Sequence, residues 1–467
     1  MELEVAKQFI KNRLAGHTEF MNLNNQAQRY YTVQNDILIG PQSTDDNPLR
    51  SADNRIAHSF YSLLVNQKAA YMFTAPPLFD VKDDTLNQLI ADDLGDYYAK
   101  YAKDLCVNAS NAGVAWLHYW VDDSGFRYGV VPSNQIIPIF DNKLGNDLIA
   151  VVRVYQNVDP SDGKVYEYYE YWNDTQCEIY RRGTWDSDYN TFEEHEAFSY
   201  LYTDENGEVQ GHDYGTPPFI PFYNNNIRSR DLDLIKKLID SYDKTYSGFM
   251  NDLEDIQEVI FILTNYSGEN RSEFLQDLKN YKTVQFESMG ADDKSGLSTL
   301  TIEIPVEARK EMLDITRKAI FDMGQGIDPQ QQGLDGTSGE AMKFLYSLLE
   351  LKAGMTETEF RLGFNKLVRA ICKYHGNDNV GAITQTWTRT SIRNDAELVD
   401  MCSKSMGVVS RKTILKNHPF VDNVEDEEKE LEAEKQQEYS DFVVQESTVN
   451  TGTEDNTNDT TGINQSA

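Results

Sequence analysis

The sequence predicts an α+β protein with more than one structural unit. The chain has 467 residues, whereas a single hydrophobic core usually stops growing at about 250–300 residues. Hydrophobic residues make up 40% of the chain and aromatic residues 11%, which excludes a wholly disordered protein. The apolar residues follow a helical period, then a period of two, then a helical period again. This order indicates a β-rich unit inside an otherwise helical chain.

Two amphipathic helices are predicted before the β-rich unit. Residues 54–74 place apolar side chains at helical spacing and stop at the Pro76-Pro77 pair. Residues 85–111 carry an aromatic-rich stripe, and Gly113 supplies a terminator.

Residues 113–223 are predicted to be β-rich. The segments 114–121 and 126–131 alternate around an Asp-Asp-Ser-Gly turn, which is typical of a hairpin. Further strands are expected at 148–155, 164–172 and 177–182.

Two rod-like helices follow, with a small mixed unit between them. Residues 229–256 have an apolar face and a charged face, and Pro305 suits the first turn of a second helix that runs to about residue 323. Between them, residues 257–304 predict a compact α/β insertion, with a strand at 259–263, a short helix near 271–278 and alternation at 300–304.

A loop and a long helix are predicted next. Residues 324–339 contain five glycines and a proline, which favours a loop. Residues 340–374 are expected to form an amphipathic helix, which Gly354 or Gly363 bends. The end of the chain is expected to hold a strand at 383–389, helices at 394–406 and 410–416, and a disordered acidic tail at 441–467.

The charge of the chain excludes one class of nucleic-acid-binding protein. Aspartate and glutamate number 76 against 43 lysines and arginines, a formal net charge of −33. Binding to DNA through a broad basic surface needs Lys and Arg against the phosphates. From residue 422 onward, 14 acidic residues face two lysines, so this segment either solubilises the chain or repels DNA.

The sequence contains no pattern typical of an enzyme. Phosphate loops, zinc helices, nucleophile elbows and dinucleotide fingerprints are all missing, and we expect no catalysis, no cofactor and no metal. The four scattered cysteines favour free thiols. No apolar run approaches the roughly 18–20 residues of a membrane span, and the acidic N-terminus does not resemble a secretory signal, so we expect a cytosol-like compartment.

The order of elements resembles the portal protein family of tailed double-stranded DNA bacteriophages, of the siphophage type. Four segments carry the resemblance: 54–77 (NRIAHSFYSLLVNQKAAYMFTAPP), 229–255 (SRDLDLIKKLIDSYDKTYSGFMNDLED), 337–353 (TSGEAMKFLYSLLELKA) and 410–421 (SRKTILKNHPFV). It covers about residues 20–440, and its specificity comes from several weak matches in the right order.

The resemblance implies a portal fold in which a mixed α/β wing, a two-helix stem, a small α/β clip, a long kinked wing helix and an α-helical crown assemble as a ring. The mapping assigns 1–227 to the wing, 228–256 and 305–323 to the stem helices, 257–304 to the clip, 324–339 to a tunnel loop, 340–389 to the long helix and a closing strand, and 390–440 to the crown.

The resemblance also implies a function and partners. A dodecamer at one capsid vertex would form the channel through which double-stranded DNA is packaged and ejected. The clip would meet the terminase large subunit and later the head-tail adaptor, while the major capsid and scaffolding proteins surround the ring. The protein would lie in the virion, after assembly in the host cytoplasm, without a membrane.

The candidate site residues follow from the loop and the first stem helix. We expect the loop side chains Asp328, Gln330, Gln331, Gln332 and Asp335 to border the narrowest passage, although the loop composition also fits a plain surface connection. Stem residues Lys236, Lys237 and Lys244 are candidates to face the channel, or they pair with acids on neighbouring subunits. An acidic or neutral wall avoids deep electrostatic wells that would stall a polyanion.

A second class of protein stays open. The rods also fit a non-enzymatic soluble scaffold or peptide-binding protein, although the apolar spacing at 232–256 does not sustain heptads for long. The assembled size of the purified chain separates the two.

Overall fold

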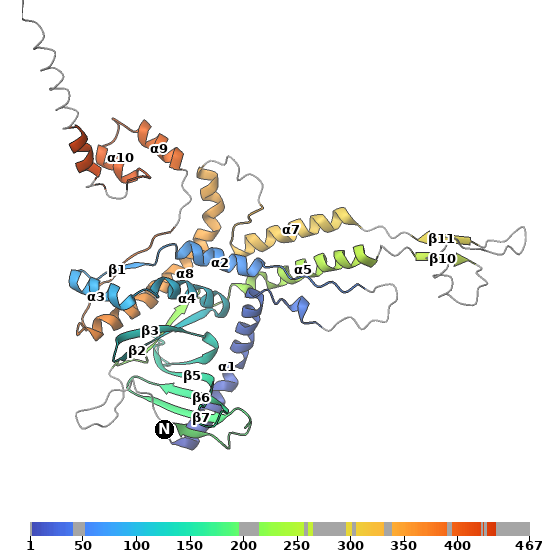
Figure 1. Cartoon of the computed structure of the whole chain (residues 1–467), viewed down its shortest axis with the longest axis horizontal. Helices are drawn as coiled ribbons and strands as arrows, with labels where there is room; N and C mark the ends of the chain where they lie inside the picture. The colour runs from blue at the N-terminus through green and yellow to red at the C-terminus, as the bar shows by residue number, and fades with distance from the viewer. Residues whose placement is uncertain are drawn as a thin grey trace, which may run out of the picture. The chain divides into compact units, whose positions relative to one another are not determined.

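The computed structural model describes residues 2–40, 52–195, 214–255, 260–264, 296–300, 305–330, 339–389, 395–421, 424 and 427–435. The chain divides into two compact units. The first comprises residues 1–331 and 345–390, and the second comprises residues 332–344 and 391–467. Figure 1 identifies the helices and strands of both.

Two antiparallel sheets form the β-rich part of the first unit. Strands β2 (Val114–Asp122), β3 (Gly125–Val131) and β9 (Phe219–Tyr223) make a sheet of order β3-β2-β9. The other sheet has the order β4-β5-β6-β7-β8, and its strands are β4 (Ile136–Phe140), β5 (Leu148–Val158), β6 (Val165–Trp172), β7 (Cys177–Gly183) and β8 (Glu193–His195). The predicted hairpin and the three further strands are confirmed. A short 3-10 turn, Ser133–Gln135, joins the sheets.

The alternation of β2 gives each face of its sheet a different core. Trp116 packs in a cluster with residues of the larger sheet, among them Trp172 and Val151. Ala115 and Leu117, on the opposite face, belong to a second core that also contains helical residues. This is the expected consequence of a two-residue side-chain period in a strand buried on both faces.

The helix predicted at 54–74 is shorter in the structure. Helix α2 spans Phe60–Met72, and residues 54–59 have no regular secondary structure and bond to α5 (Leu232–Asp255). The backbone N–H of Asn54 donates to Asn251 over 2.6 Å, and that of Ile56 donates to Ser247 over 3.0 Å. These donors are therefore satisfied by side chains of another helix, which replaces the helical bonds that the local pattern predicted.

The helix predicted at 85–111 is two helices. Helix α3 (Asp84–Leu94) ends at Gly95, which has a φ of 57°, and α4 (Tyr98–Ala112) follows. A positive φ costs glycine little, so the chain turns there. Gly113, with a φ of 81°, ends α4 as predicted.

The first helix, α1 (Leu3–Tyr31), has no counterpart in the predictions. Its first half packs Ala6 and Ile10 against the larger sheet, and its last turns place Ala27 and Tyr30 in a core with α2, α5 and α7. The buried positions between them are polar, His17 and Asn24. They interrupt the apolar period from which such a helix would be predicted. The 3-10 turn Asp36–Leu38 follows α1.

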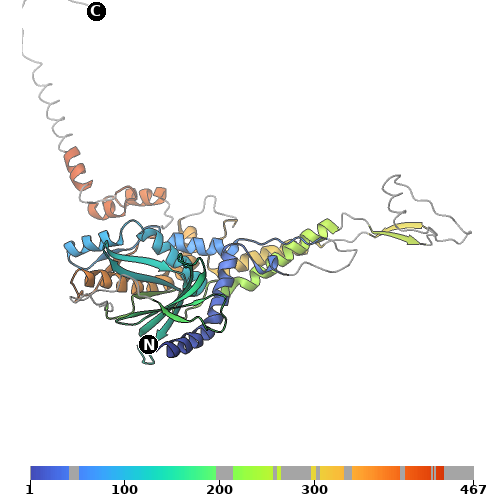
Figure 2. The ribbon, with the colours of Figure 1, turned by 60° about the horizontal axis from the view of Figure 1, so that its bottom comes forward.

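The two rods are confirmed as α5 and α7 (Val306–Gly324), which run side by side (Figure 1 and Figure 2). Strand β10 (Ile260–Thr264) agrees with the prediction and pairs with β11 (Gly296–Leu300). The alternation predicted at 300–304 lies, apart from Leu300 at the end of β11, outside the described residues. The helix predicted near 271–278 lies outside the described residues.

The long helix is confirmed as α8, Gly339–Tyr374. Strand β12 (Thr384–Thr386) is shorter than predicted and pairs with β1 (Leu78–Asp80). In the second unit, α9 (Asp395–Lys404) and α10 (Arg411–Asn417) match two predicted helices, and the Ser410 hydroxyl caps α10 by accepting from the N–H of Thr413. The tail at 441–467 lies outside the described residues.

Candidate functional site

The predicted loop begins where α7 ends, and its first residues are fixed to the helices beside it. Asp328 accepts two hydrogen bonds from Arg317 of α7, over 2.9 Å from Nε and 2.6 Å from Nη2. Its Oδ1 also accepts from the backbone N–H of Gln330 over 2.9 Å. Burial raises the pKa of Asp328, but the bonds from Arg317 and Gln330 outweigh it and lower the pKa below the usual value. The carboxylate is thus ionised and neutralised within the same subunit.

Gln67 of α2 holds the backbone of the same segment. Its side-chain amide donates to the carbonyl of Ile327 over 2.7 Å and accepts from the N–H of Ile327 over 3.0 Å. A Cβ at Gly326 would overlap Leu64 of α2. The chain therefore approaches α2 closely here, and only glycine leaves the space.

A buried polar cluster lies beneath this segment, where α2, α5, α7 and α8 meet. Lys68 of α2 is fully buried and donates to Asp231 over 2.8 Å and to Asn224 over 2.7 Å. Lys352 of α8 lies 3.1 Å from the same Asp231 carboxylate and donates to the carbonyl of Gly324 over 2.9 Å. The buried carboxylate of Asp231 therefore pairs with two buried lysines.

Burial and charge act in opposite directions on this cluster. Burial raises the pKa of Asp231, but Lys352 and Lys68 outweigh it and lower the pKa. Burial lowers the pKa of Lys352, Asp231 raises it, and the like charge of Lys68 lowers it further, so that the net direction is down. The single carboxylate is what makes two buried ammonium groups tolerable.

The candidate stem lysines differ in their surroundings. Lys236 lies 2.7 Å from both Asp36 and Asp240, and its ammonium is 5.1 Å from the Tyr30 ring centroid. Lys237 and Lys244 are exposed. The intramolecular pairs thus engage Lys236 and leave the other two side chains in solvent in the single subunit.

The structure places two of the five predicted loop residues. Asp328 and Gln330 are joined by the hydrogen bond above, whereas Gln331, Gln332 and Asp335 lie outside the described residues. Sequence reasoning missed Arg317, Gln67 and Lys352. Arg317 pairs with Asp328, which lies beyond the end of its own helix. A buried lysine has the same local sequence pattern as an exposed one, so only the fold reveals these residues.

The two rods expose several large apolar side chains in the subunit. On α5 and α7 these are Leu234, Met250, Leu253, Val306, Met312, Ile315 and Met323. Arg309 of α7 pairs with Asp252 of α5, which links the two rods. Such an apolar surface on two packed helices is typical of an interaction surface.

A metal cluster and a membrane span are both absent from the described residues. Within these ranges, no group of three or more His, Cys, Asp or Glu side chains is placed to hold a metal ion. No helix in the part of the chain that the structure describes is both long and apolar enough to cross a membrane.

Comparison with known proteins gives the family. The sequence model described as "Phage portal protein, SPP1 Gp6-like" matches residues 10–441. The portal protein of Clostridium phage phiCD119 is 42% identical over 466 residues, which cover 95% of this chain and 100% of that protein. The portal protein of Bacillus phage SPP1 is 30% identical over 434 residues, which cover 88% and 83%.

A solved structure, the neck of an empty GTA particle computed with C6 symmetry, is similar with a TM-score of 0.42 and 12% identity, covering 76% of this chain and 88% of that one. The family match spans most of the sequence and agrees with both curated relatives. The chain therefore belongs to the SPP1 Gp6-like family of phage portal proteins.

Proposed function

We propose that this chain assembles into a dodecameric ring at one vertex of a phage capsid and forms the channel through which double-stranded DNA is packaged and ejected. The observation that carries the proposal is the portal family match over residues 10–441. Portal proteins are structural components of the virion, so the role is conduction and docking, not catalysis.

The apolar surface of the rods supports assembly with a second copy of the chain. Ile315 and Met312 of α7 are 56% and 50% exposed, and Leu253 of α5 is 42% exposed. A ring buries one patch of each subunit against a different patch of the next. The proposed stem helices α5 and α7 are suited to that contact, because each of them exposes several large apolar side chains.

The charge of the chain supports passage of DNA without tight binding. A net charge of −33 gives no broad basic surface, and phosphate contacts by Lys and Arg are what hold DNA. Gln330, Gln331, Gln332 and Asp335 would border the narrowest passage. Asp328 would act at the base of this loop, where Arg317 already neutralises it.

The lysines of the first stem helix would contribute little to DNA binding. Lys237 and Lys244 are exposed and are the candidates to offer scattered positive charges to the channel or to pair with acids of a neighbouring copy. Lys236 is the weaker candidate, because Asp36 and Asp240 already engage it.

The docking roles follow the same mapping. Residues 257–304 would form the clip that meets the terminase large subunit and then the head-tail adaptor. The wing would lie among the major capsid and scaffolding proteins, in the virion and, during assembly, in the host cytoplasm.

Electron microscopy of the purified chain tests the proposal, together with light scattering. We expect end-on rings with a central hole and a mass about twelve times the 53.4 kDa of one chain. A monomer or dimer at high concentration would favour the alternative, a soluble scaffold or peptide-binding protein.

A deletion of residues 328–335 tests the loop separately. Rings should still form, and the packaging rate or the retention of DNA should change. Normal packaging and retention in the deletion variant would refute a direct role of the loop.

A further inference from the structure

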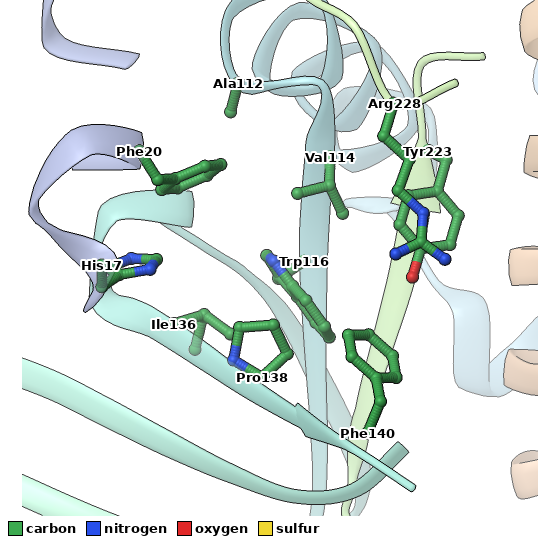
Figure 3. A pocket seen from close by; sticks show the side chains of 10 residues that line it. All are labelled: His17, Phe20, Ala112, Val114, Trp116, Ile136, Pro138, Phe140, Tyr223 and Arg228. Carbon is green, nitrogen blue, oxygen red and sulfur yellow. The ribbon is translucent and has the colours of Figure 1, made fainter. Parts of the chain in front are cut away.

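An apolar cavity of about 240 Å³ lies between α1 and the two sheets, and one of its lining residues, Arg228, comes shortly before α5. Its ten lining residues are His17, Phe20, Ala112, Val114, Trp116, Ile136, Pro138, Phe140, Tyr223 and Arg228. Figure 3 shows His17 and Phe20 on one wall, Tyr223, Phe140 and Arg228 on the opposite wall, and Trp116 between them. The volume is below the roughly 300–1,000 Å³ of a typical small-molecule site, so it suits one large side chain.

A polar atom without a partner lies on the first wall. His17 is 8% exposed, and its Nε2 has no hydrogen-bond partner. Its ring stacks on Phe20 with centroids 4.7 Å apart, which fixes the orientation of the imidazole. Buried polar atoms are nearly always hydrogen-bonded, so an unpaired Nε2 at a cavity wall points to a ligand group that completes the bond.

A cation without an acidic partner lies on the opposite wall. Arg228 is exposed, and its guanidinium lies 4.3 Å from the Tyr223 ring centroid and 5.5 Å from that of Phe140. It forms no ion pair with any described residue. The two rings hold the guanidinium over the cavity by cation–π contacts and leave its N–H groups available.

The backbone of Arg228 has a conformation that residues other than glycine rarely adopt. Its φ is 58°, which costs a residue with a Cβ about 1–2 kcal/mol. The N–H of Arg228 donates to the carbonyl of Asn225 over 3.0 Å, and a Cβ at Gly113 would overlap the carbonyl of Arg228. The fold therefore maintains a strained arginine at the rim, and such strain is often kept at functional sites.

The residue types that line the cavity indicate the charge and the shape of its ligand. Acidic residues outnumber basic ones by 76 to 43 in the chain, yet the ten lining residues include one arginine and no carboxylate. An acidic group at the lining of the cavity would meet the positive charge of Arg228. An aromatic ring would meet Trp116, Phe20 and Phe140.

We propose that this cavity binds a tyrosine side chain that is followed by an acidic residue in a segment of a partner protein. The ring fills the apolar space, the phenol hydroxyl hydrogen-bonds to His17 Nε2, and the neighbouring carboxylate pairs with Arg228 at the rim. The tyrosine and the acidic residue together use both polar groups of the cavity, whereas a purely apolar anchor leaves His17 unpaired. The test uses peptides and point variants, so it requires neither ring formation nor DNA.

Saturation-transfer NMR with short capped peptides tests the proposal on the full chain. The probe is Ac-Gly-Tyr-Glu-Gly-NH2 at about 1 mM, a concentration that detects binding of about −4 kcal/mol. Three matched peptides replace Tyr by Phe, Tyr by Ala, or Glu by Gln. We expect signal on the tyrosine ring, a several-fold weaker response for the Phe and Gln peptides, and none for the Ala peptide.

Two variants assign the contacts to residues. Arg228→Asn removes the guanidinium, and asparagine tolerates a positive φ better than most residues, so the variant should fold and bind the Glu peptide at least about tenfold more weakly. His17→Phe should abolish the preference for Tyr over Phe. Arg13→Asn is the matched control, because the Arg13 guanidinium also lies over a ring, that of Phe9, but outside the cavity.

Several outcomes would overturn the proposal. These are no saturation transfer from any peptide, equal binding of the Ala peptide, or wild-type binding by both Arg228→Asn and His17→Phe. Displacement of the Tyr peptide by the oligonucleotide d(TTTT) at lower concentration than by unlabelled peptide would assign the cavity to a nucleic acid and exclude the peptide.

Discussion

The ammonium of Lys352 in α8 donates a hydrogen bond to the carbonyl oxygen of Gly324, the last residue of α7, over 2.9 Å. The same ammonium lies 3.1 Å from Asp231, directly before α5. One buried cation thus fixes the end of α7 and the start of α5 to α8. The beginning of the loop depends on this connection, because it follows Gly324 immediately.

Asp231 should contribute more to the free energy of unfolding than Lys352 does. Asp231→Asn leaves Lys68 and Lys352 buried without a counter-charge, and we expect it to lower the free energy of unfolding by about 3–5 kcal/mol. Lys352→Met leaves the Lys68–Asp231 pair intact, so the loss should be about 1–3 kcal/mol. Urea unfolding measures both. Asp104→Asn, in an exposed pair with Lys100, is the control and should leave the midpoint unchanged. A larger loss in Lys352→Met than in Asp231→Asn would contradict this account.

The Arg317–Asp328 pair should control local opening of the loop base. In Asp328→Asn the bidentate ion pair is lost and the hydrogen bond from the Gln330 N–H is weakened, so the Gln330 amide should exchange with solvent about tenfold faster. Hydrogen exchange measured by mass spectrometry on a peptide that covers residues 326–330 tests this. Asp322 is an exposed acid on α7, the helix that carries Arg317. In the control variant Asp322→Asn, the same peptide should exchange at the wild-type rate. Unchanged exchange in Asp328→Asn would mean that Gln67 alone holds the segment.

Replacing each of two glycines of α8 by alanine should change the stability of the protein in opposite directions. A Cβ at Gly363 would lie 2.5 Å from the ring of Phe222, which is fully buried between Phe360 and Phe364. Gly363→Ala should therefore destabilise the protein by about 1–3 kcal/mol. A Cβ at Gly354 would meet no atom within 4 Å, so Gly354→Ala should stabilise it by up to about 1 kcal/mol. Thermal unfolding of both variants tests the pair, and the same sign of change in both would be inconsistent with this packing.

Acid should destabilise the protein through His17. Burial lowers the pKa of His17 to about 4, whereas an unfolded histidine titrates near about 6.5. Between these values the unfolded chain binds a proton that the folded chain does not, so stability falls as the pH decreases from about 6.5 to about 4. The urea midpoint should therefore drop less between pH 7 and pH 5 in His17→Phe than in the wild type. Equal drops would show that other groups dominate the acid response.

Ring assembly should depend on the exposed apolar face of α7. Ile315→Glu places a charge on a side chain that is 56% exposed in the subunit, so it should leave the fold intact and convert rings to smaller species in light scattering. Ile315→Leu is the control and should assemble normally. Intact rings in Ile315→Glu would exclude this residue from the contact between subunits.

The sequence predicted the elements whose pattern is local. The rods, the hairpin, the three long strands and α8 follow from periods of 3.6 and two, and Gly113 and Ser410 end or begin helices as expected. It did not predict that residues 54–59 stay outside the helix, because the side chains that satisfy the backbone donors of this segment come from α5, about 190 residues away. It also did not predict the break at Gly95, since a glycine inside an apolar stripe is compatible with one helix.

The site was less predictable than the fold. Loop composition pointed to Asp328 and Gln330, but the residues that fix them, Arg317 and Gln67, come from two other helices. The buried lysines were missed for a similar reason. Local sequence patterns predict that Lys68 and Lys352 face solvent. Their burial becomes favourable only because the fold places the carboxylate of Asp231 next to both of them.

The pairing of β1 with β12 has a consequence for how the chain is made. Leu78–Asp80 finds its partner only at Thr384–Thr386, about 300 residues later, so the first unit cannot close until most of the chain has been synthesised. At about 5–20 residues per second, that interval lasts roughly 15–60 s. The core that contains Phe73 and Phe364 stays incomplete and exposed for most of that time. The nascent protein is therefore most prone to aggregation or premature association on the ribosome, before any ring can form.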